Sequence, residues 1–172
     1  QTPALMVRTG HFHNRPEGAT RGAWSDDGGR SWTAFASEPP DGDGAGRITL
    51  AADGARAIWQ PRNGSAHWIT ADRGGRWQRV RGLPPTAVVE ADRVDEGIYY
   101  AFDATSGAHY LSGNGGVEFS PAQAQTGAIG DWFRAELQPH PERSGELWIA
   151  ASWRGLLHWS PQGLRRLAGV EN

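Results

Sequence analysis

A short motif recurs along this chain at nearly constant spacing. Its clear copies at residues 25–32, 70–77 and 112–119 have Ser or Thr first, Asp or Asn third, Gly fifth and an aromatic residue last. A worn copy at 160–167 keeps the serine and ends on an apolar residue, but lacks the acid and the fifth-position glycine. Repeats of roughly 45 residues are typical of β-propeller blades. The repeat therefore predicts an all-β chain built from similar four-stranded units.

The motif predicts a hairpin turn that is held by its own side chains. The first hydroxyl and the third side chain can hydrogen-bond to backbone groups inside the turn, and the glycine supplies a positive φ. The closing aromatic residue then starts the next strand and packs inward. Asp27, Asp72 and Asn114 are therefore expected to hold turns and not a metal ion, because the distal glutamate of a calcium loop is absent.

The composition supports short strands and excludes several classes of function. The 172 residues include 24 glycines and 11 prolines, which favour turns over long helices. A formal net charge of -2, with no concentrated basic face, argues against a nucleic-acid partner. No cysteine is present, so the chain has no disulfide, thiol nucleophile or Cys-ligated metal. No apolar run approaches the length of a membrane span, so no membrane partner is expected.

The chain divides into about four units of up to four antiparallel strands each. Their approximate bounds are 1–38, 46–81, 86–120 and 132–170. In the second unit, Asp53-Gly54 lies between two apolar runs and predicts a tight hairpin after the innermost strand. The first unit has no candidate for an innermost strand, which would leave backbone groups unpaired. We therefore expect the remaining segments of a larger propeller to supply that strand; a self-contained four-bladed ring is the alternative.

The loops that follow the second strand of each unit form the candidate ligand-binding surface. They lie opposite the motif turns, and varied loops on a rigid scaffold usually carry binding residues. These loops combine flat rings with hydrogen-bonding groups, which suits sugars, because pyranose faces stack on rings while hydroxyls meet polar side chains. The candidate sugar-binding residues are His11, His13, Trp59, Arg62, Asn63, Phe102, Asp103, Trp153 and Arg154.

Other chemistry on these loops has less support in the sequence. His11 and His13 alternate along an extended segment, but no third ligand follows at a diagnostic spacing, so we expect neither a metal nor a cofactor. Asp103 and Asp131 are candidate catalytic acids, although single carboxylates on loops are usually solvated. Serine-nucleophile motifs and phosphate-cradling loops are missing from the sequence.

An ordered series of motifs resembles one known enzyme family. It spans most of the chain and comprises 22–32, 48–61 with Trp59-Gln60-Pro61, 82–84, 91–94 with Asp92-Arg93-Val94, and 100–107. In this order the motifs are similar to the C-terminal propeller of glycoside hydrolase family 74, the xyloglucanases. The turn motif alone is shared with sialidases and sortilin-type receptors. The ordered series is much more specific, although Asn114 and the worn fourth copy depart from the family pattern.

The resemblance implies a tandem pair of seven-bladed propellers that hold xyloglucan in the cleft between them. Hydrolysis would use two aspartates, one from each propeller, with inversion at the anomeric carbon. By family order both aspartates lie upstream of this segment, so no catalytic residue is assigned here and the segment alone is expected to be inactive. The implied partners are xyloglucan and the remaining propeller segments.

The resemblance also implies a secreted or periplasmic protein. All 17 basic residues are arginine, a bias that we interpret as that of a GC-rich bacterial genome. The alternative function is a non-catalytic propeller of the same construction that binds a glycan or a protein. A cleft aspartate in another segment of the protein would favour the enzyme.

Overall fold

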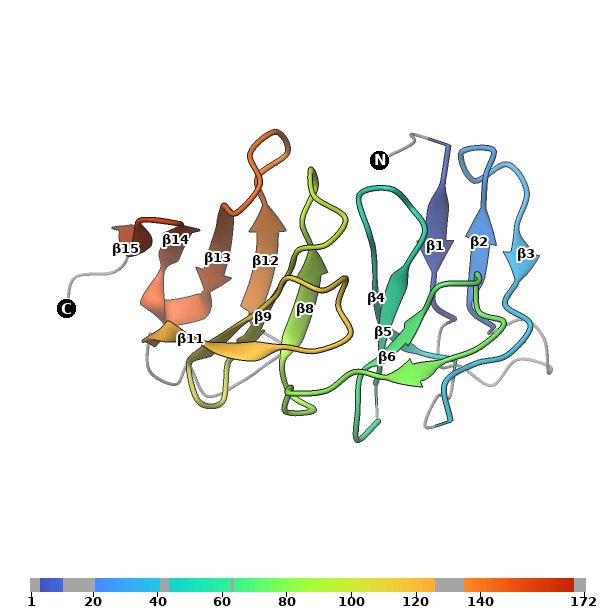
Figure 1. Cartoon of the computed structure of the whole chain (residues 1–172), viewed down its shortest axis with the longest axis horizontal. Coiled ribbons are helices and arrows are strands. Elements are labelled where there is room, and N and C mark those ends of the chain that lie inside the picture. The colour runs from blue at the N-terminus through green and yellow to red at the C-terminus, as the bar shows by residue number, and fades with distance from the viewer. Residues whose placement is uncertain (1–3, 11–20, 41–43, 63, 126–134, 169–172) are drawn as a thin grey trace.

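The computed structural model describes residues 4–10, 21–40, 44–62, 64–125 and 135–168, which form four antiparallel sheets in sequence order (Figure 1). The first sheet contains β1 (Met6–Arg8), β2 (Ala23–Ser25) and β3 (Thr33–Ala34). The second contains β4 (Gly46–Leu50), β5 (Ala57–Pro61), β6 (Trp68–Thr70) and β7 (Gln78–Arg79). In each sheet, consecutive strands are hydrogen-bonded neighbours.

The third and fourth sheets each contain four strands. The third is made of β8 (Val88–Ala91), β9 (Tyr99–Asp103), β10 (Ala108–Ser112) and β11 (Ser120–Gln125). The fourth is made of β12 (Ala135–Pro139), β13 (Leu147–Ala151), β14 (Leu156–Ser160) and β15 (Gly163–Ala168), with the 3-10 helix η2 (Ser152–Arg154) after β13. The predicted all-β fold of antiparallel units is confirmed. Among the described residues, no helix is long and apolar enough to cross a membrane.

The innermost strands of neighbouring sheets lie side by side. β12 lies next to β8, and β8 lies next to β4 (Figure 1). β1 lies beside β4, but it pairs with β2 and corresponds to β5, the second strand of the next sheet. Within the described residues, no strand pairs with the other edge of β1. The first sheet therefore has three described strands where each of the others has four.

The recurring motif forms the turn between the third and fourth strands of a sheet. In the second sheet, Thr70 Oγ1 accepts a hydrogen bond from the N–H of Gly74 at 3.0 Å, and Asp72 Oδ1 accepts one from the N–H of Arg76 at 2.8 Å. Gly74 has a φ of 81°, a left-handed conformation that suits glycine. The first turn has the corresponding two bonds at 2.9 Å. The prediction that these side chains hold their own turns is confirmed.

In the third turn an asparagine makes the bonds of the aspartate. Asn114 Oδ1 accepts hydrogen bonds from the Ser112 hydroxyl at 2.9 Å and from the N–H of Glu118 at 3.1 Å. An amide oxygen can take this role because both partners are donors. The worn fourth copy lacks this side chain, and there Ser160 pairs directly with Gly163 across a tight turn.

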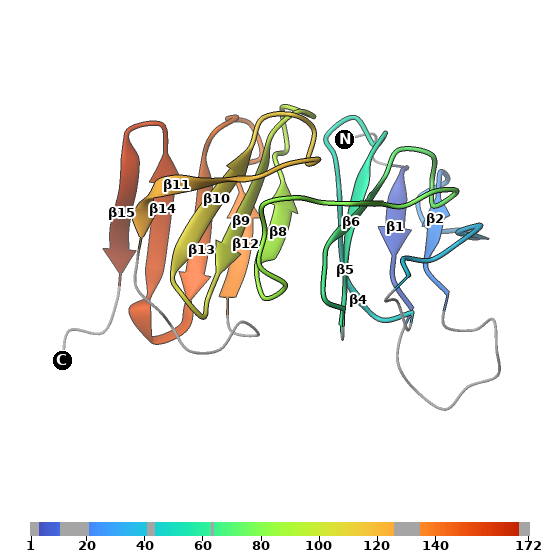
Figure 2. The same cartoon turned by 60° about the horizontal axis from the view of Figure 1, so that its bottom comes forward.

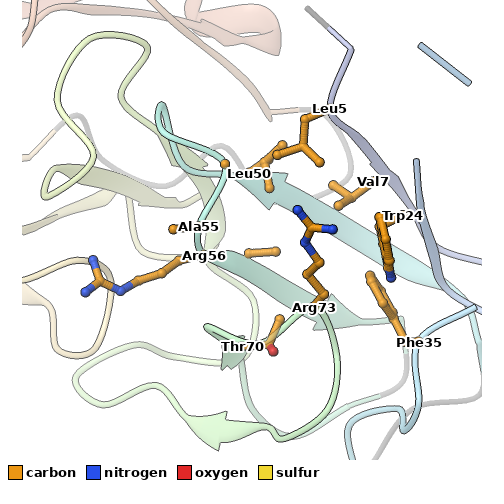
Figure 3. Close-up of a pocket in the computed structure, with 11 residues that line it drawn as sticks. Leu5, Val7, Trp24, Phe35, Leu50, Ala55, Arg56, Thr70 and Arg73 are labelled. Atoms are coloured by element: carbon orange, nitrogen blue, oxygen red, sulfur yellow. The ribbon is translucent and has the colours of Figure 1, made fainter. Parts of the chain in front are cut away.

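Apolar side chains fill the spaces between neighbouring sheets. One cluster lies between the third and fourth sheets, and another lies between the second and third. Between the first and second sheets, the rings of Phe35, Trp59 and Trp77 pack with centroids 5.6 to 6.0 Å apart. Nearby, the Arg73 guanidinium lies 4.2 Å from the Trp24 ring centroid, and both line a cavity of about 20 Å³ (Figure 3). Such close packing makes the sheets a rigid scaffold for their loops.

Candidate functional site

The sheets present two ends, which we name the loop end and the box end. The loop end carries the connections after β5, β9 and β13, and the box end carries the motif turns after β6, β10 and β14 (Figure 2). Asp53 and Gly54 of the β4–β5 turn also lie at the box end, where they line a hollow together with Asp26 and Asp72. The predicted ligand-binding residues that the structure describes adjoin the loop end.

Trp59 is a core residue and presents no surface to a ligand. Its exposed fraction is 0%, and its ring packs 6.0 Å from Phe35 and 5.7 Å from Trp77. Its Nε1 donates a hydrogen bond to the Ala45 carbonyl at 3.4 Å. A Cβ on Gly22 would lie 2.4 Å from the indole, so the glycine makes room for it. The predicted role of Trp59 in sugar stacking is therefore wrong, because the indole fills the space between two sheets.

Phe102 is buried in the same way between the third and fourth sheets. Its exposed fraction is 0%, and its ring centroid lies 4.8 Å from that of His109. Both faces of β9 are covered, as the burial of all its residues shows. The predicted sugar contact of Phe102 is therefore also wrong. Its ring contributes apolar contacts to the core.

Asp103 is a buried anchor for the turn after β9. Only 4% of its surface is exposed. Its Oδ1 accepts hydrogen bonds from the hydroxyls of Thr86 at 2.8 Å and Thr105 at 2.7 Å, and its Oδ2 accepts one from Ser106 at 2.5 Å. Burial raises the pKa of Asp103, but the hydrogen bonds from Ser106, Thr105 and Thr86 outweigh it and lower the pKa. The carboxylate therefore holds the loop, which corrects its predicted role as a sugar ligand or catalytic acid.

Exposed polar groups nevertheless remain at the loop end. Arg62 is exposed just after β5, and Arg154 is half-buried on η2. Thr105 and Ser106 are exposed while their hydroxyls donate to Asp103. These two hydroxyls are not among the predicted sugar-binding residues. The sequence does carry a signal for them, because the run Asp103-Ala104-Thr105-Ser106-Gly107 combines residue types that are typical of a turn held by its own side chains.

The other predicted residues lie outside the described part of the chain. These are His11, His13 and Asn63, together with Asp131. Trp153 belongs to η2, but its side chain is not among those described. Sugar contacts by His11, His13, Asn63 and Trp153 therefore stay predictions, as does the role of Asp131 as a catalytic acid.

Aspartates of the motif turns are held in their ionised form. Hydrogen bonds from the N–H and the hydroxyl of Ser31 lower the pKa of Asp27 to about 2. The N–H of Arg76 is the main cause that lowers the pKa of Asp72. A general acid in glycoside hydrolysis instead needs a raised pKa, so that it carries a proton at the working pH. These two carboxylates are suited to holding turns and not to proton donation.

Comparison with known proteins relates nearly the whole chain to one family. The chain matches the crystal structure of a GH74 xyloglucanase from Xanthomonas campestris with a TM-score of 0.89 and 42% identity, over 98% of its length. The resemblance to the family-74 xyloglucanases is confirmed. The chain is also 34% identical to a xyloglucanase from Paenibacillus sp. over 98% of its length. It is 31% identical to an oligoxyloglucan-reducing end-specific xyloglucanase from Emericella nidulans over 92%.

The chain spans only a minor part of these family-74 relatives. It covers 24% of the Xanthomonas campestris chain, 17% of the Paenibacillus protein and 22% of the Emericella nidulans protein. Its four sheets therefore match part of a larger propeller protein. A scan against family models found no match for the chain.

Proposed function

We propose that this chain is part of a secreted glycoside hydrolase that cleaves the β-1,4-glucan backbone of xyloglucan. The observation that carries the proposal is the 42% identity to the Xanthomonas campestris xyloglucanase, with a TM-score of 0.89 over 98% of the chain. A match this close runs through all four sheets and through the loops between them. It supports a shared substrate class and not only a shared fold.

In this proposal the chain supplies scaffold and part of the polysaccharide-binding surface. Arg62, Thr105 and Ser106 are exposed at the loop end, where guanidinium and hydroxyl groups can hydrogen-bond to sugar hydroxyls. Both hydroxyls donate hydrogen bonds to the Asp103 carboxylate, which holds the two side chains in place. Less side-chain entropy is therefore lost when a sugar binds them. Trp153 stays the candidate for a stacking contact, since η2 places its backbone at the same end.

The proposed hydrolysis inverts the anomeric carbon and uses two aspartates from other segments of the protein. In inverting enzymes the two carboxyl groups lie about 6.5–9.5 Å apart, which leaves room for the attacking water. One carboxylate activates that water while the other protonates the leaving oxygen. Asp27, Asp72, Asp92 and Asp103 have lowered pKa values and are bound within turns, which supports catalytic acids elsewhere. The segment alone is therefore expected to be inactive.

The test is hydrolysis by the full-length protein that contains this chain. Incubation with xyloglucan should release new reducing ends, and an unbranched β-1,4-glucan serves as the control for recognition of the branches. Binding of xyloglucan without new reducing ends, measured by titration calorimetry, would favour the alternative of a non-catalytic propeller. If the full-length protein neither binds nor hydrolyses xyloglucan, the proposal is wrong.

A further inference from the structure

A cluster of charged side chains lies along the three innermost strands β4, β8 and β12. Arg47 of β4 and Glu136 of β12 form an ion pair, in which the guanidinium donates two hydrogen bonds of 3.0 and 3.3 Å to the carboxylate. The two residues lie 89 positions apart, and β8 lies between their strands (Figure 1). The pair therefore reaches across β8 and joins the second sheet to the fourth.

Glu90 of β8 belongs to the same cluster. Its Oε2 accepts a hydrogen bond from the Thr49 hydroxyl at 2.9 Å and lies 3.9 Å from Nη2 of Arg93. The Thr49 oxygen in turn accepts a hydrogen bond from the N–H of Ala91 at 3.1 Å. Because β8 pairs with β9 along its opposite edge, the Thr49 side chain joins β8 to β4 at this point.

The Glu90 carboxylate has few partners for a group that is so little exposed. Only 25% of its side chain is exposed to solvent. An ionised carboxylate can accept about four hydrogen bonds. Among the described residues, only Thr49 donates one to it, and the Arg93 guanidinium at 3.9 Å is too far away to do so. The surroundings therefore favour the uncharged form of this carboxyl group.

The charged groups around Glu90 come from all three inner strands and their ends. Burial raises the pKa of Glu90, and the Glu136 carboxylate adds to the rise because the two negative charges repel each other. The hydrogen bond from β4 and the positive charges of Arg93 and Arg47 lower the pKa, but they do not outweigh burial. Tyr100, the partner of Glu90 on β9, stays neutral because burial raises the pKa of its hydroxyl. The folded protein therefore binds a proton at Glu90 at a higher pH than the unfolded chain does.

We propose that five side chains on and next to the inner strands act as a proton-operated lock, which holds β4, β8 and β12 together more tightly when Glu90 carries a proton. We name this cluster the inner-strand lock; its members are Arg47, Thr49, Glu90, Arg93 and Glu136. A neutral Glu90 costs less to bury and no longer repels Glu136. An ionised Glu90 instead favours separation of β4 and β8, because water then reaches its oxygens.

The sign of the pH effect follows from the raised pKa of Glu90. The extra stability is fully present below the pKa of the unfolded chain and is lost as the pH rises through the folded pKa. Weak acid should therefore tighten the inner strands, whereas neutral pH should loosen them. The lock is a property of the packed sheets and does not depend on the proposed hydrolysis.

Hydrogen/deuterium exchange of the Ala91 amide, followed in the full-length protein, tests the lock. This N–H bonds to Thr49, so it exchanges when β4 and β8 separate. Its protection, corrected for the intrinsic exchange rate, is compared from about pH 4 to about pH 7.5. The test variant is Glu90→Gln, which keeps an oxygen for the Thr49 hydroxyl but cannot ionise. The matched control is Glu118→Gln, since Glu118 is an exposed carboxylate that also bonds to an arginine of the neighbouring sheet, Arg81, at 3.0 Å.

In the wild type, protection of Ala91 should be at least about twofold higher at the acid end than at neutral pH, because one proton is linked to closure of the lock. Glu90→Gln should be equally protected at both ends, and more protected than the wild type at neutral pH. Glu118→Gln should follow the wild type. Protection that does not change with pH in the wild type, or a pH dependence that persists in Glu90→Gln, would overturn the lock.

Glu136→Gln is a second variant, which tests the lock even if Glu90→Gln does not fold. It removes one negative charge near Glu90 and keeps an oxygen for the Arg47 guanidinium. Because Glu136 raises the pKa of Glu90, the midpoint of the pH-dependent protection should move to lower pH. A purely structural loss would lower protection at every pH and leave the midpoint in place. An unmoved midpoint would therefore remove Glu136 from the lock, and a midpoint moved to higher pH would refute its electrostatic basis.

Discussion

Asp92 accepts a hydrogen bond on Oδ2 from the N–H of Gly145 at 3.0 Å, although the two residues lie 53 positions apart. The bond joins the segment after β8 to the turn between β12 and β13. Asp92 Oδ1 accepts from the N–H of Val94 at 2.7 Å, and the Tyr100 hydroxyl donates to Oδ2. The exposed fraction of Asp92 is 0%. This carboxylate is therefore a buried polar link between the third and fourth sheets.

Asp92→Asn should destabilise the protein, because an amide NH2 in place of Oδ2 would face the donors of Tyr100 and Gly145. We expect the free energy of unfolding to fall by about 2 to 3 kcal/mol, the cost of leaving buried polar groups unsatisfied. Denaturant titration at neutral pH measures the change. Asp95→Asn is the matched control, because Asp95 Oδ1 accepts from the N–H of Gly97 and an amide oxygen can do the same. Equal stability of the two variants would contradict the assignment.

The link formed by Asp92 should also be lost in acid. Burial raises the pKa of Asp92, but hydrogen bonds from Tyr100, Asp95, Val94 and Gly145 outweigh it and hold the pKa below 3.8. Because the folded pKa is depressed, the stabilisation is present above the unfolded pKa and is lost as the pH falls through the folded one. The melting temperature, followed from about pH 5 to about pH 2, should therefore fall more steeply in the wild type than in Asp92→Asn. Parallel curves would show that Asp92 does not cause the acid sensitivity.

His67 and His109 lie just before the motif in the second and third sheets, but their partners differ. His67 Nε2 donates to the Ala87 carbonyl at 2.7 Å, whereas the buried Nε2 of His109 has no hydrogen-bond partner among the residues that the structure describes. The fourth sheet has the buried Leu157 in this place. His109→Leu should leave the unfolding free energy unchanged or raise it by about 1 kcal/mol, while His67→Leu should lower it by about 1 to 3 kcal/mol. Denaturant titration compares them, and the reverse order would refute this explanation.

Asp72→Asn should leave the second motif turn intact, because Asn114 makes the corresponding bonds in the third turn. Asp72→Ala should lower the melting temperature, because the hydroxyl of Thr70 and the N–H of Arg76 both lose their acceptor. Scanning calorimetry measures the melting temperatures of both variants and of the wild type. A melting temperature lowered as much by Asn as by Ala would mean that the charge of Asp72, and not its acceptor oxygen, holds the turn.

Arg62→Ala tests the proposed role of the loop end in polysaccharide binding. If Arg62 binds sugar in the ground state and the transition state alike, its loss should raise KM for xyloglucan about fivefold with kcat unchanged. The control is Arg165→Ala, an exposed arginine on the outermost strand β15. Kinetics of reducing-end release give both constants. An unchanged KM in Arg62→Ala would remove Arg62 from the binding surface.

The sequence by itself determined the repeated unit and its strand order. The bonds that hold a motif turn span only four positions, as from Thr70 to Gly74 and from Asp72 to Arg76. Consecutive strands then pair within each sheet. Such local interactions leave a regular pattern of residue types along the chain, so the pattern predicts them. The order of motifs also led to the xyloglucanase family, which the comparisons confirmed.

Only the tertiary structure decided which side chains can reach a ligand. Trp59 and Phe102 precede loops in the sequence, yet neighbouring sheets cover both rings, because a middle strand of a packed sheet is buried on both faces. Asp103 is engaged by Thr86, which lies 17 positions away on another strand connection. Contacts between sheets join residues that are distant in the chain, and the spacing of residue types in one sequence does not record them.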